Sequence, residues 1–170
     1  MKQSVYFLLF VSCLLGFSQS SFAENEQPIV VNIKRMSMDV ALRIAQATIA
    51  QCRKEGVQVA VTVVDRGGHP QVVLRDVLAQ DLTLTISQKK AYTAMSFNLA
   101  TSQMVDRFKG SYSVPKVDSL IIAAGGLPIT ASGNIIGGVG VSGAPSGEID
   151  EKCAKAGVDA VLDDLEMATM

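Results

Sequence analysis

The chain has 170 residues, of which 48% are hydrophobic and 18% charged, so it is long enough to bury one good core. Its 15 Lys and Arg residues against 16 Asp and Glu residues give a formal net charge of −1. Because this near-neutral balance has neither a basic stripe nor interleaved aromatic residues, the composition argues against nucleic-acid binding.

The first 23 residues are typical of a cleavable export signal. Lys2 supplies a positive charge, Val5 to Gly16 is an apolar run, and Ser21-Phe22-Ala23 places small residues before a cleavage point. The apolar run is shorter than the ~20 residues that a membrane span needs. No later segment contains ~18 uninterrupted apolar residues. We therefore expect an exported protein, periplasmic or extracellular, with no membrane span after processing.

This signal divides the chain into three parts. Residues 1–23 are the predicted signal peptide, residues 24–36 a lead-in, and residues 37–170 a single domain. Cys52 and Cys153 remain after processing, and export makes a disulfide between them chemically possible. Two buried free thiols are the alternative, and the sequence does not decide between them.

The first half of the domain predicts a helix followed by a β-hairpin. Apolar residues at helical spacing predict a helix over Met38–Glu55, which Gly56 ends. β-branched residues predict a strand over Val57–Asp65, and a second strand over Gln71–Arg75 follows a turn with paired glycines. The two strands are expected to pair as an antiparallel hairpin.

The second half predicts two helices, two or three strands and a final helix. Helices are expected over Asp81–Ala100 and Ser102–Phe108, strands over Ser119–Ala123 and Ile135–Ser142, and a last helix over Ser146–Leu165. Because hairpins replace regular βαβ alternation, the order favours an antiparallel sheet with helices packed on it, which is the α+β class.

Five motifs then occur in a fixed order. They are Val64-Asp65-Arg66-Gly67-Gly68-His69, Lys90-Ala91-Tyr92-Thr93-Ala94, Gly125-Gly126-Leu127-Pro128-Ile129, Gly137-Gly138-Val139-Gly140-Val141-Ser142-Gly143, and Asp150-Glu151 followed by Ala156-Gly157. In this order and spacing the chain resembles the GlcG/HbpS family, which includes the C-terminal domain of PduO-type proteins. The resemblance runs from about Met36 to Leu165.

This resemblance implies a profilin-like fold, an antiparallel sheet with helices on its faces, and homo-oligomers from dimers to octamers. Some members bind haem, and an exported member is described as the haem-binding, redox-sensing partner of a membrane sensor kinase. The sequence departs from the family after the second strand. Arg75-Asp76-Val77-Leu78-Ala79 stands where members often have Arg-Met-Asp-Gly-Ala. If this loop borders the binding site, the ligand of this chain could differ from that of the family.

His69 is the leading candidate for a ligand to a metal. It is the only histidine in the chain and lies in the Gly-Gly turn, where a neutral imidazole could ligate haem iron. A solvent-facing turn residue without a ligand is the alternative.

Further residues are candidates for binding the haem. Lys90 could pair with a propionate, and Tyr92, with Tyr112, could stack or donate a hydrogen bond. The alternative for Lys90 and its neighbour Lys89 is a solvated helix face, which we prefer for Lys89. Thr101 is either a polar pocket group or, preferably, the cap of the helix that follows.

The remaining motif residues favour structural roles. The stretch Gly137 to Gly143 lacks the ending of a phosphate-binding P-loop, so packing of the sheet against a helix or a second subunit explains its glycines better. Asp65 is expected to order its turn, and Asp150 and Glu151 to favour a helix N-terminus.

Three functions follow from these residues together with what the family resemblance implies. The first is an exported haem-binding protein for sensing, scavenging or protection, with haem as cofactor and His69 as its ligand. The second is an enzyme that degrades haem with peroxide or acts on a small organic acid. The third is an oligomeric interaction module whose pocket is vestigial.

Overall fold

The computed structural model describes residues 28–111 and 113–169, and residues from Ile33 onward form one compact unit. The predicted signal peptide and Tyr112 lie outside the described residues. Within the described ranges, no helix combines the length and the apolar character that crossing a membrane requires.

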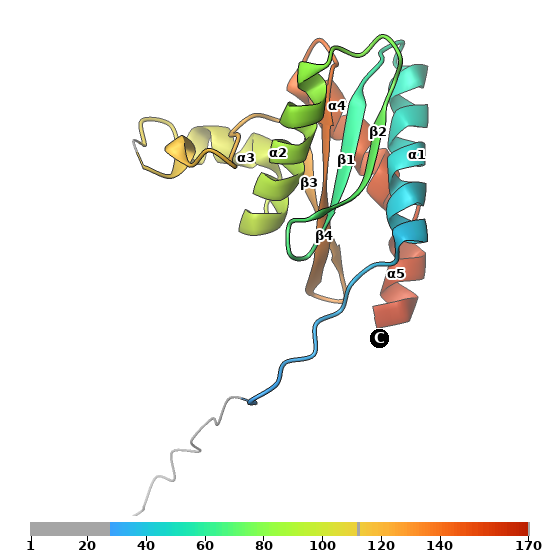
Figure 1. Ribbon diagram of the computed structural model, residues 1–170, viewed down its shortest axis with the longest axis vertical. Coiled ribbons are helices and arrows are strands. Elements are labelled where there is room, and N and C mark those ends of the chain that lie inside the picture. Colours follow the sequence, from blue (N-terminus) through green and yellow to red (C-terminus); the bar gives the residue numbers. More distant parts are fainter. Residues whose placement is uncertain (1–27, 112, 170) are drawn as a thin grey trace, which may run out of the picture. The chain divides into compact units, whose positions relative to one another are not determined.

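The elements follow one another as a helix, a hairpin, two helices, a second hairpin and two helices (Figure 1). In chain order they are α1 (Met38–Lys54), β1 (Ala60–Asp65), β2 (Pro70–Arg75), α2 (Leu82–Phe97), α3 (Thr101–Arg107), the 3-10 helix η1 (Val114–Lys116), β3 (Gly126–Ala131), β4 (Asn134–Ser142), α4 (Gly147–Asp159) and α5 (Leu162–Thr169).

The strands form one antiparallel sheet in the order β2-β1-β4-β3. Both hairpins, β1 with β2 and β3 with β4, join strands that are adjacent in the chain. The predicted α+β class, with helices packed on an antiparallel sheet, is therefore confirmed. The central position of β1 and β4 explains why their residues are almost entirely buried.

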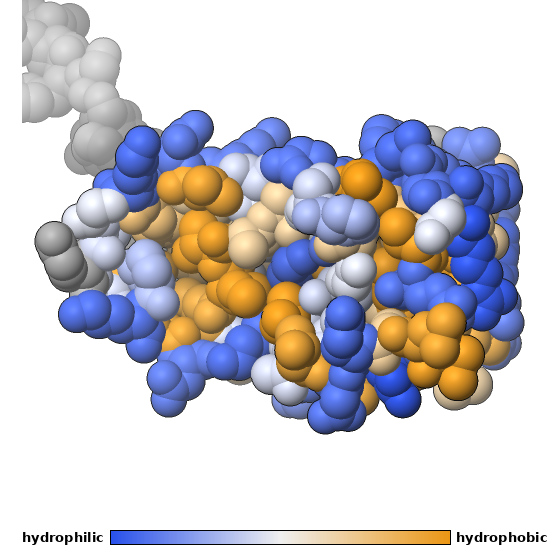
Figure 2. Space-filling model, turned by 90° about the horizontal axis from the view of Figure 1, so that it is seen from above, coloured by the Kyte–Doolittle hydropathy of each residue, from blue (hydrophilic) through white to orange (hydrophobic). Residues whose placement is uncertain are grey.

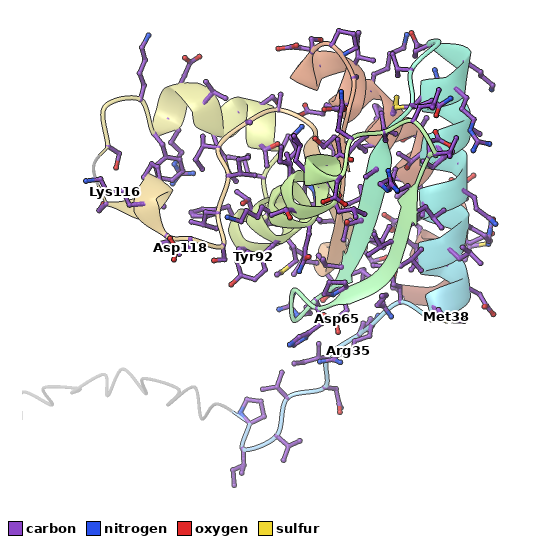
Figure 3. The ribbon with its side chains drawn as sticks, turned by 45° about the horizontal axis from the view of Figure 1, so that its top comes forward. Arg35, Met38, Asp65, Tyr92, Lys116 and Asp118 are labelled. Carbon is purple, nitrogen blue, oxygen red and sulfur yellow. A yellow bond between two sulfur atoms is a disulfide. The ribbon has the colours of Figure 1, made fainter. Side chains whose placement is uncertain are left out.

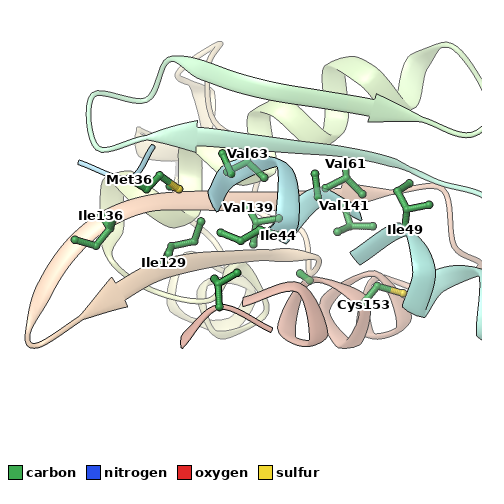
Figure 4. Close-up of a cluster of buried hydrophobic side chains, with 14 of the residues drawn as sticks. Met36, Ile44, Ile49, Val61, Val63, Ile129, Ile136, Val139, Val141 and Cys153 are labelled. Carbon is green, nitrogen blue, oxygen red and sulfur yellow. The ribbon is translucent and has the colours of Figure 1, made fainter. Parts of the chain in front are cut away.

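The two faces of the sheet carry different helices. Val61 and Val139 point toward the main apolar core, where they meet residues of α1 and α4 such as Ile44 (Figure 4). Thr62 points the opposite way, and its hydroxyl oxygen lies 2.9 Å from that of Ser87 in α2. Because side chains alternate along a strand, α1 and α4 cover one face of the sheet and α2 covers the other.

Glycines in β4 let α2 lie directly on the sheet. A Cβ atom at Gly140 would be 2.0 Å from the carbonyl oxygen of Ser87 and 2.4 Å from the backbone nitrogen of Ala91. At Gly138 it would be 2.5 Å from the carbonyl oxygen of Ala91. This close approach confirms that the glycines of this motif serve the packing of sheet against helix.

A disulfide links the two helices on the opposite face. Cys52 of α1 and Cys153 of α4 are bonded through their sulfur atoms, with Cα atoms 5.4 Å apart and a sequence separation of 101. Both side chains are fully buried in the core. The structure thus selects the disulfide over the alternative of two free thiols.

Two predicted elements were wrong. Residues 119–123 form no strand, because the partner of β4 begins only at Gly126, opposite Gly140. The backbone N–H of Ile121 instead donates to the hydroxyl of Thr93 at 3.0 Å. The final helix is two helices, since the chain turns at residues 160–161 and buries Val161 in the core.

Candidate functional site

The turn between β1 and β2 is built around the carboxylate of Asp65. The backbone N–H groups of Gly67 and His69 donate to Asp65 Oδ1 at 2.8 and 3.0 Å. A backbone bond from Gly68 to the carbonyl of Asp65 at 2.9 Å closes the turn. Aspartate is favoured in turns for this ability to bind backbone amides a few residues on, so the predicted ordering role of Asp65 is confirmed.

Gly68 brings this turn into contact with α2. Its φ of +83° lies in the left-handed region, which glycine adopts without strain. A Cβ atom there would lie 2.6 Å from Cδ2 of Tyr92 and 3.0 Å from Cε of Met95. The turn therefore rests on the ring of Tyr92, which projects from α2 near the turn that carries Asp65 (Figure 3).

His69 is exposed at the tip of this turn. Its side chain is 80% exposed, and Nδ1 lies 3.5 Å from Asp65 Oδ1. The other carboxylate oxygen, Oδ2, lies 3.4 Å from the guanidinium of Arg35. Burial raises the pKa of Asp65, but the amides of His69 and Gly67, with the charges of Arg35 and His69, outweigh burial and lower that pKa.

A pocket of about 400 Å³ opens between the turn and α2, and we call it the turn–helix pocket. Its wall comes from the turn, from one side of α2 and from the loop that precedes β3. The lining residues are Gly68, His69, Pro70, Thr85, Gln88, Lys89, Tyr92 and Ser119. Its size falls within the ~300–1,000 Å³ that small-molecule sites occupy.

Exposed apolar residues lie on the same side of the sheet. Val73 pairs with Thr62 in the register of β1 and β2, so it faces the α2 side, and it is 45% exposed. Leu82 begins α2, one turn before Thr85, and is 60% exposed. Two exposed apolar side chains, one on β2 and one at the start of α2, therefore lie on the same side of the sheet as the turn–helix pocket.

The loop from β2 to α2 adds two more exposed apolar side chains. Val77 is 83% exposed and Leu78 is 76% exposed. Figure 2 shows apolar groups interrupting the polar surface on one face of the molecule. Val77 and Leu78 belong to the segment Arg75–Ala79, where the sequence differs from the family pattern. Asp76 beside them is buried and bonded to Arg53.

Lys90 lies outside the turn–helix pocket. Its ammonium donates to Asp150 Oδ2 and to the carbonyl oxygen of Val141, both at 2.8 Å, and the side chains of the ion pair are 5% and 4% exposed. The alternative of a solvated Lys90 is therefore wrong. Burial raises the pKa of Asp150 more than the Lys90 ammonium lowers it. Both residues border a second pocket of about 410 Å³ at the start of α4.

Thr101 is buried between α3 and β3. Its hydroxyl accepts the backbone N–H of Gly126 at 2.8 Å, so it ties the two elements together. Thr101 is the first residue of α3 and Ala100 is its N-cap, while the carboxylate of Glu151 accepts the backbone N–H of Ser102 at 3.3 Å. The predicted helix cap is wrong, and Thr101 does not line the turn–helix pocket.

Several residues of the pocket were missed. Lys89, expected to be solvated, lines it together with Thr85 and Gln88. These residues precede Tyr92 by three, seven and four positions, which places them on the same side of a helix. This spacing would have predicted them as neighbours of Tyr92, whereas no pattern in the sequence indicated that Ser119 lines the pocket.

The turn–helix pocket has a single imidazole donor. His69 is the only histidine, and among residues 28–111 and 113–169 no three or more His, Cys, Asp or Glu side chains gather as a metal site. A bare zinc ion needs three or four protein ligands. Haem iron, already held by its macrocycle, needs one or two axial ligands from the protein. The donor set therefore fits haem better than a free ion.

Comparisons with known proteins find similar sequences. The family profile described as "Haem degrading protein HbpS-like" matches residues 36–159. Protein GlcG of Escherichia coli (strain K12) is 34% identical over 111 residues, which are 63% of this chain and 81% of GlcG.

Solved structures share the fold. The HbpS double mutant from Streptomyces reticuli aligns with a TM-score of 0.75 at 34% identity, covering 78% of this chain and 90% of that one. A PduOC structure, solved as a haem complex, aligns with a TM-score of 0.69 at 27% identity, covering 74% of this chain and 94% of that one.

Proposed function

The chain belongs to the family of HbpS-like haem degrading proteins, and from this premise we propose that it binds haem in the turn–helix pocket. In this proposal, His69 would hold the haem iron. The observation that carries it is the position of the only imidazole of the chain, exposed at the mouth of a pocket that also holds Tyr92 and Lys89.

The chemistry of the lining residues suits the parts of a haem. The imidazole of His69 is a good axial donor to iron. The ring of Tyr92 offers a flat apolar surface with a hydroxyl at its edge. The ammonium of Lys89 can pair with a propionate through a charge-assisted hydrogen bond. When bound, haem supplies an iron centre for redox chemistry, and the protein supplies the ligand and the surroundings.

Apolar surface next to the pocket supports a flat amphipathic ligand. Val73 and Leu82 are exposed on the same side of the sheet as Tyr92, which lines the pocket together with His69. Removing apolar surface from water contributes roughly 25 cal/mol per Å². A macrocycle larger than the pocket would therefore gain free energy by extending over these side chains.

The proposed setting is outside the cytoplasm. The buried Cys52–Cys153 disulfide supports export, because such bonds persist mainly in oxidising compartments. Exposed Val77 and Leu78 support self-association, since apolar groups on a surface often mark contacts between proteins. Sedimentation of the processed protein at tens of micromolar would test this, and a plain monomer would contradict it.

A haem titration followed by absorbance tests the central proposal. The processed protein is compared with His69→Ala, with Lys89→Ala, and with Lys54→Ala as a matched lysine control on α1, across the sheet from the pocket. We expect a saturable Soret band that His69→Ala shifts or abolishes and Lys89→Ala weakens, with Lys54→Ala unchanged. A weak, unsaturating signal that is equal in all four proteins would overturn the proposal.

Adding hydrogen peroxide to the complex separates binding from degradation. A protein that protects haem keeps its Soret band, whereas a haem-degrading enzyme bleaches it with turnover. The His69→Ala variant shows whether any bleaching depends on the site.

A further inference from the structure

We propose that Asp65 is a positioning residue that keeps the neutral ring of His69 protonated on Nδ1, which leaves the lone pair of Nε2 free to face outward. This deepens the proposed function, because Nε2 then becomes the atom offered to iron. The part that concerns iron rests on haem binding, while the part that concerns the ring is a property of the protein alone.

The carboxylate of Asp65 is fixed before any ligand arrives. Its side chain is only 10% exposed, and the amides of Gly67 and His69 hold Oδ1 at 2.8 and 3.0 Å. The same oxygen lies 3.5 Å from Nδ1 of His69. Arg35 is close to the other oxygen, so the two oxygens face different neighbours.

The charge on this carboxylate selects one tautomer of the ring. An ionised carboxylate has only acceptor sites. Nδ1 with a proton therefore presents a favourable dipole to Oδ1, whereas Nδ1 without one would set a lone pair against a negative charge. Which ring nitrogen carries the proton is set by the partner of the other nitrogen. At 3.5 Å this attraction is chiefly electrostatic, because the distance exceeds the usual range of a hydrogen bond.

The same attraction also favours a ring orientation that turns Nε2 away from Asp65. Histidines that ligate metals commonly donate their second ring N–H to a carboxylate, which fixes the ring and raises the basicity of the ligating nitrogen. In free histidine the neutral ring prefers its proton on Nε2. Protonation on Nδ1 of a side chain that is 80% exposed would therefore report the action of Asp65.

Asp65→Asn separates this role from the building of the turn. The amide oxygen of asparagine can still accept the backbone N–H groups of Gly67 and His69, but it carries no charge. Arg35→Gln is the matched control, because it removes a charge from the far oxygen of the same carboxylate.

The test is ¹⁵N NMR of the imidazole in the haem-free protein at about pH 9, where imidazole rings are neutral. Only one ring gives signals, so no assignment is needed. We expect mainly the Nδ1–H form in the unaltered protein and in Arg35→Gln, and mainly the Nε2–H form in Asp65→Asn. Mainly Nε2–H in the unaltered protein, or no change in Asp65→Asn with the backbone amide signals of the turn retained, would overturn the proposal.

The midpoint potential of the haem complex is the second readout. We expect Asp65→Asn to raise it, because a ligand without a nearby carboxylate donates less electron density to ferric iron. An unchanged potential would contradict the role of Asp65 toward iron. If the unaltered protein binds no haem while its ring is protonated on Nδ1, the proposed function fails and the tautomer assignment stands.

Discussion

Removing the Cys52–Cys153 disulfide should strongly destabilise the domain without changing the site. The two cysteines are 101 positions apart in the chain. By closing this loop, the disulfide lowers the conformational entropy of the unfolded chain. For a loop of roughly 100 residues, this stabilises the folded state by about 4.7 kcal/mol. That is a large part of the ~5–15 kcal/mol by which native domains are stable. The double variant Cys52→Ala/Cys153→Ala is therefore expected to lose about 4–5 kcal/mol.

Urea unfolding measures this loss. With a slope of ~2 kcal/mol per M, the midpoint should fall by about 2 M. A fall in unfolding free energy of less than about 1 kcal/mol would refute the reasoning that the closed loop constrains the unfolded chain.

The same variant tests the separation of the two faces of the sheet. The disulfide joins α1 to α4, whereas the turn–helix pocket lies beside α2 on the other face. The folded variant should therefore bind haem with unchanged affinity. A weakened affinity in protein that is still folded would show that the two faces are coupled.

Three further changes probe the turn–helix pocket, the buried ion pair of Lys90 and the carboxylate of Asp65. Gly68→Ala combines backbone strain of roughly 1–3 kcal/mol with a collision between its Cβ and the Tyr92 ring, so it should weaken haem binding. The control is Gly56→Ala, whose φ is +77° and whose Cβ would meet open space, so it should show only the strain. Lys90→Met leaves a buried carboxylate without its partner and should cost about 3–5 kcal/mol in urea unfolding, and a loss below about 1 kcal/mol would contradict its role. The lowered pKa of Asp65 contributes stability that is present above the ordinary aspartate value of ~3.9 and is lost as the pH falls through the folded-state value. Asp65→Asn should lose less stability than the unaltered protein over that acid range, and equal losses would contradict this.

Local patterns predicted the turn and one part of the pocket. The Gly-Gly motif marked the turn that exposes His69, and helical spacing placed Tyr92 on α2. Their meeting depends on the contact of Gly68 with the Tyr92 ring, which no spacing in the sequence shows. The proposed ligand role of His69 stays a prediction.

Contacts between residues that are far apart in the sequence explain which predictions from the sequence failed. Lys90 follows Ser87 by three positions and precedes Ala94 by four, so it belongs to the buried side of α2. Its partner Asp150 is 60 positions away, and only the folded structure shows that the two charges meet. The spacing alone left Lys90 open to a ligand or to solvent.

The misplaced strand has a similar cause. Residues 119–123 are as apolar as a strand, but the backbone of Ile121 bonds to Thr93 and never reaches β4. β3 begins at Gly126, whose own N–H also bonds to Thr101. The pairing of strands depends on these contacts between distant segments, and apolar character does not report them.

Pulsed electron paramagnetic resonance of the ferric haem complex, with ¹⁵N introduced only in histidine, tests the central claim most directly. The chain has one histidine, so any ¹⁵N hyperfine coupling of the size expected for an axial nitrogen identifies His69 as the iron ligand. The untagged, processed protein is predicted to show this coupling, and His69→Ala to lack it. A ferric haem complex of the unaltered protein without ¹⁵N coupling would contradict the account.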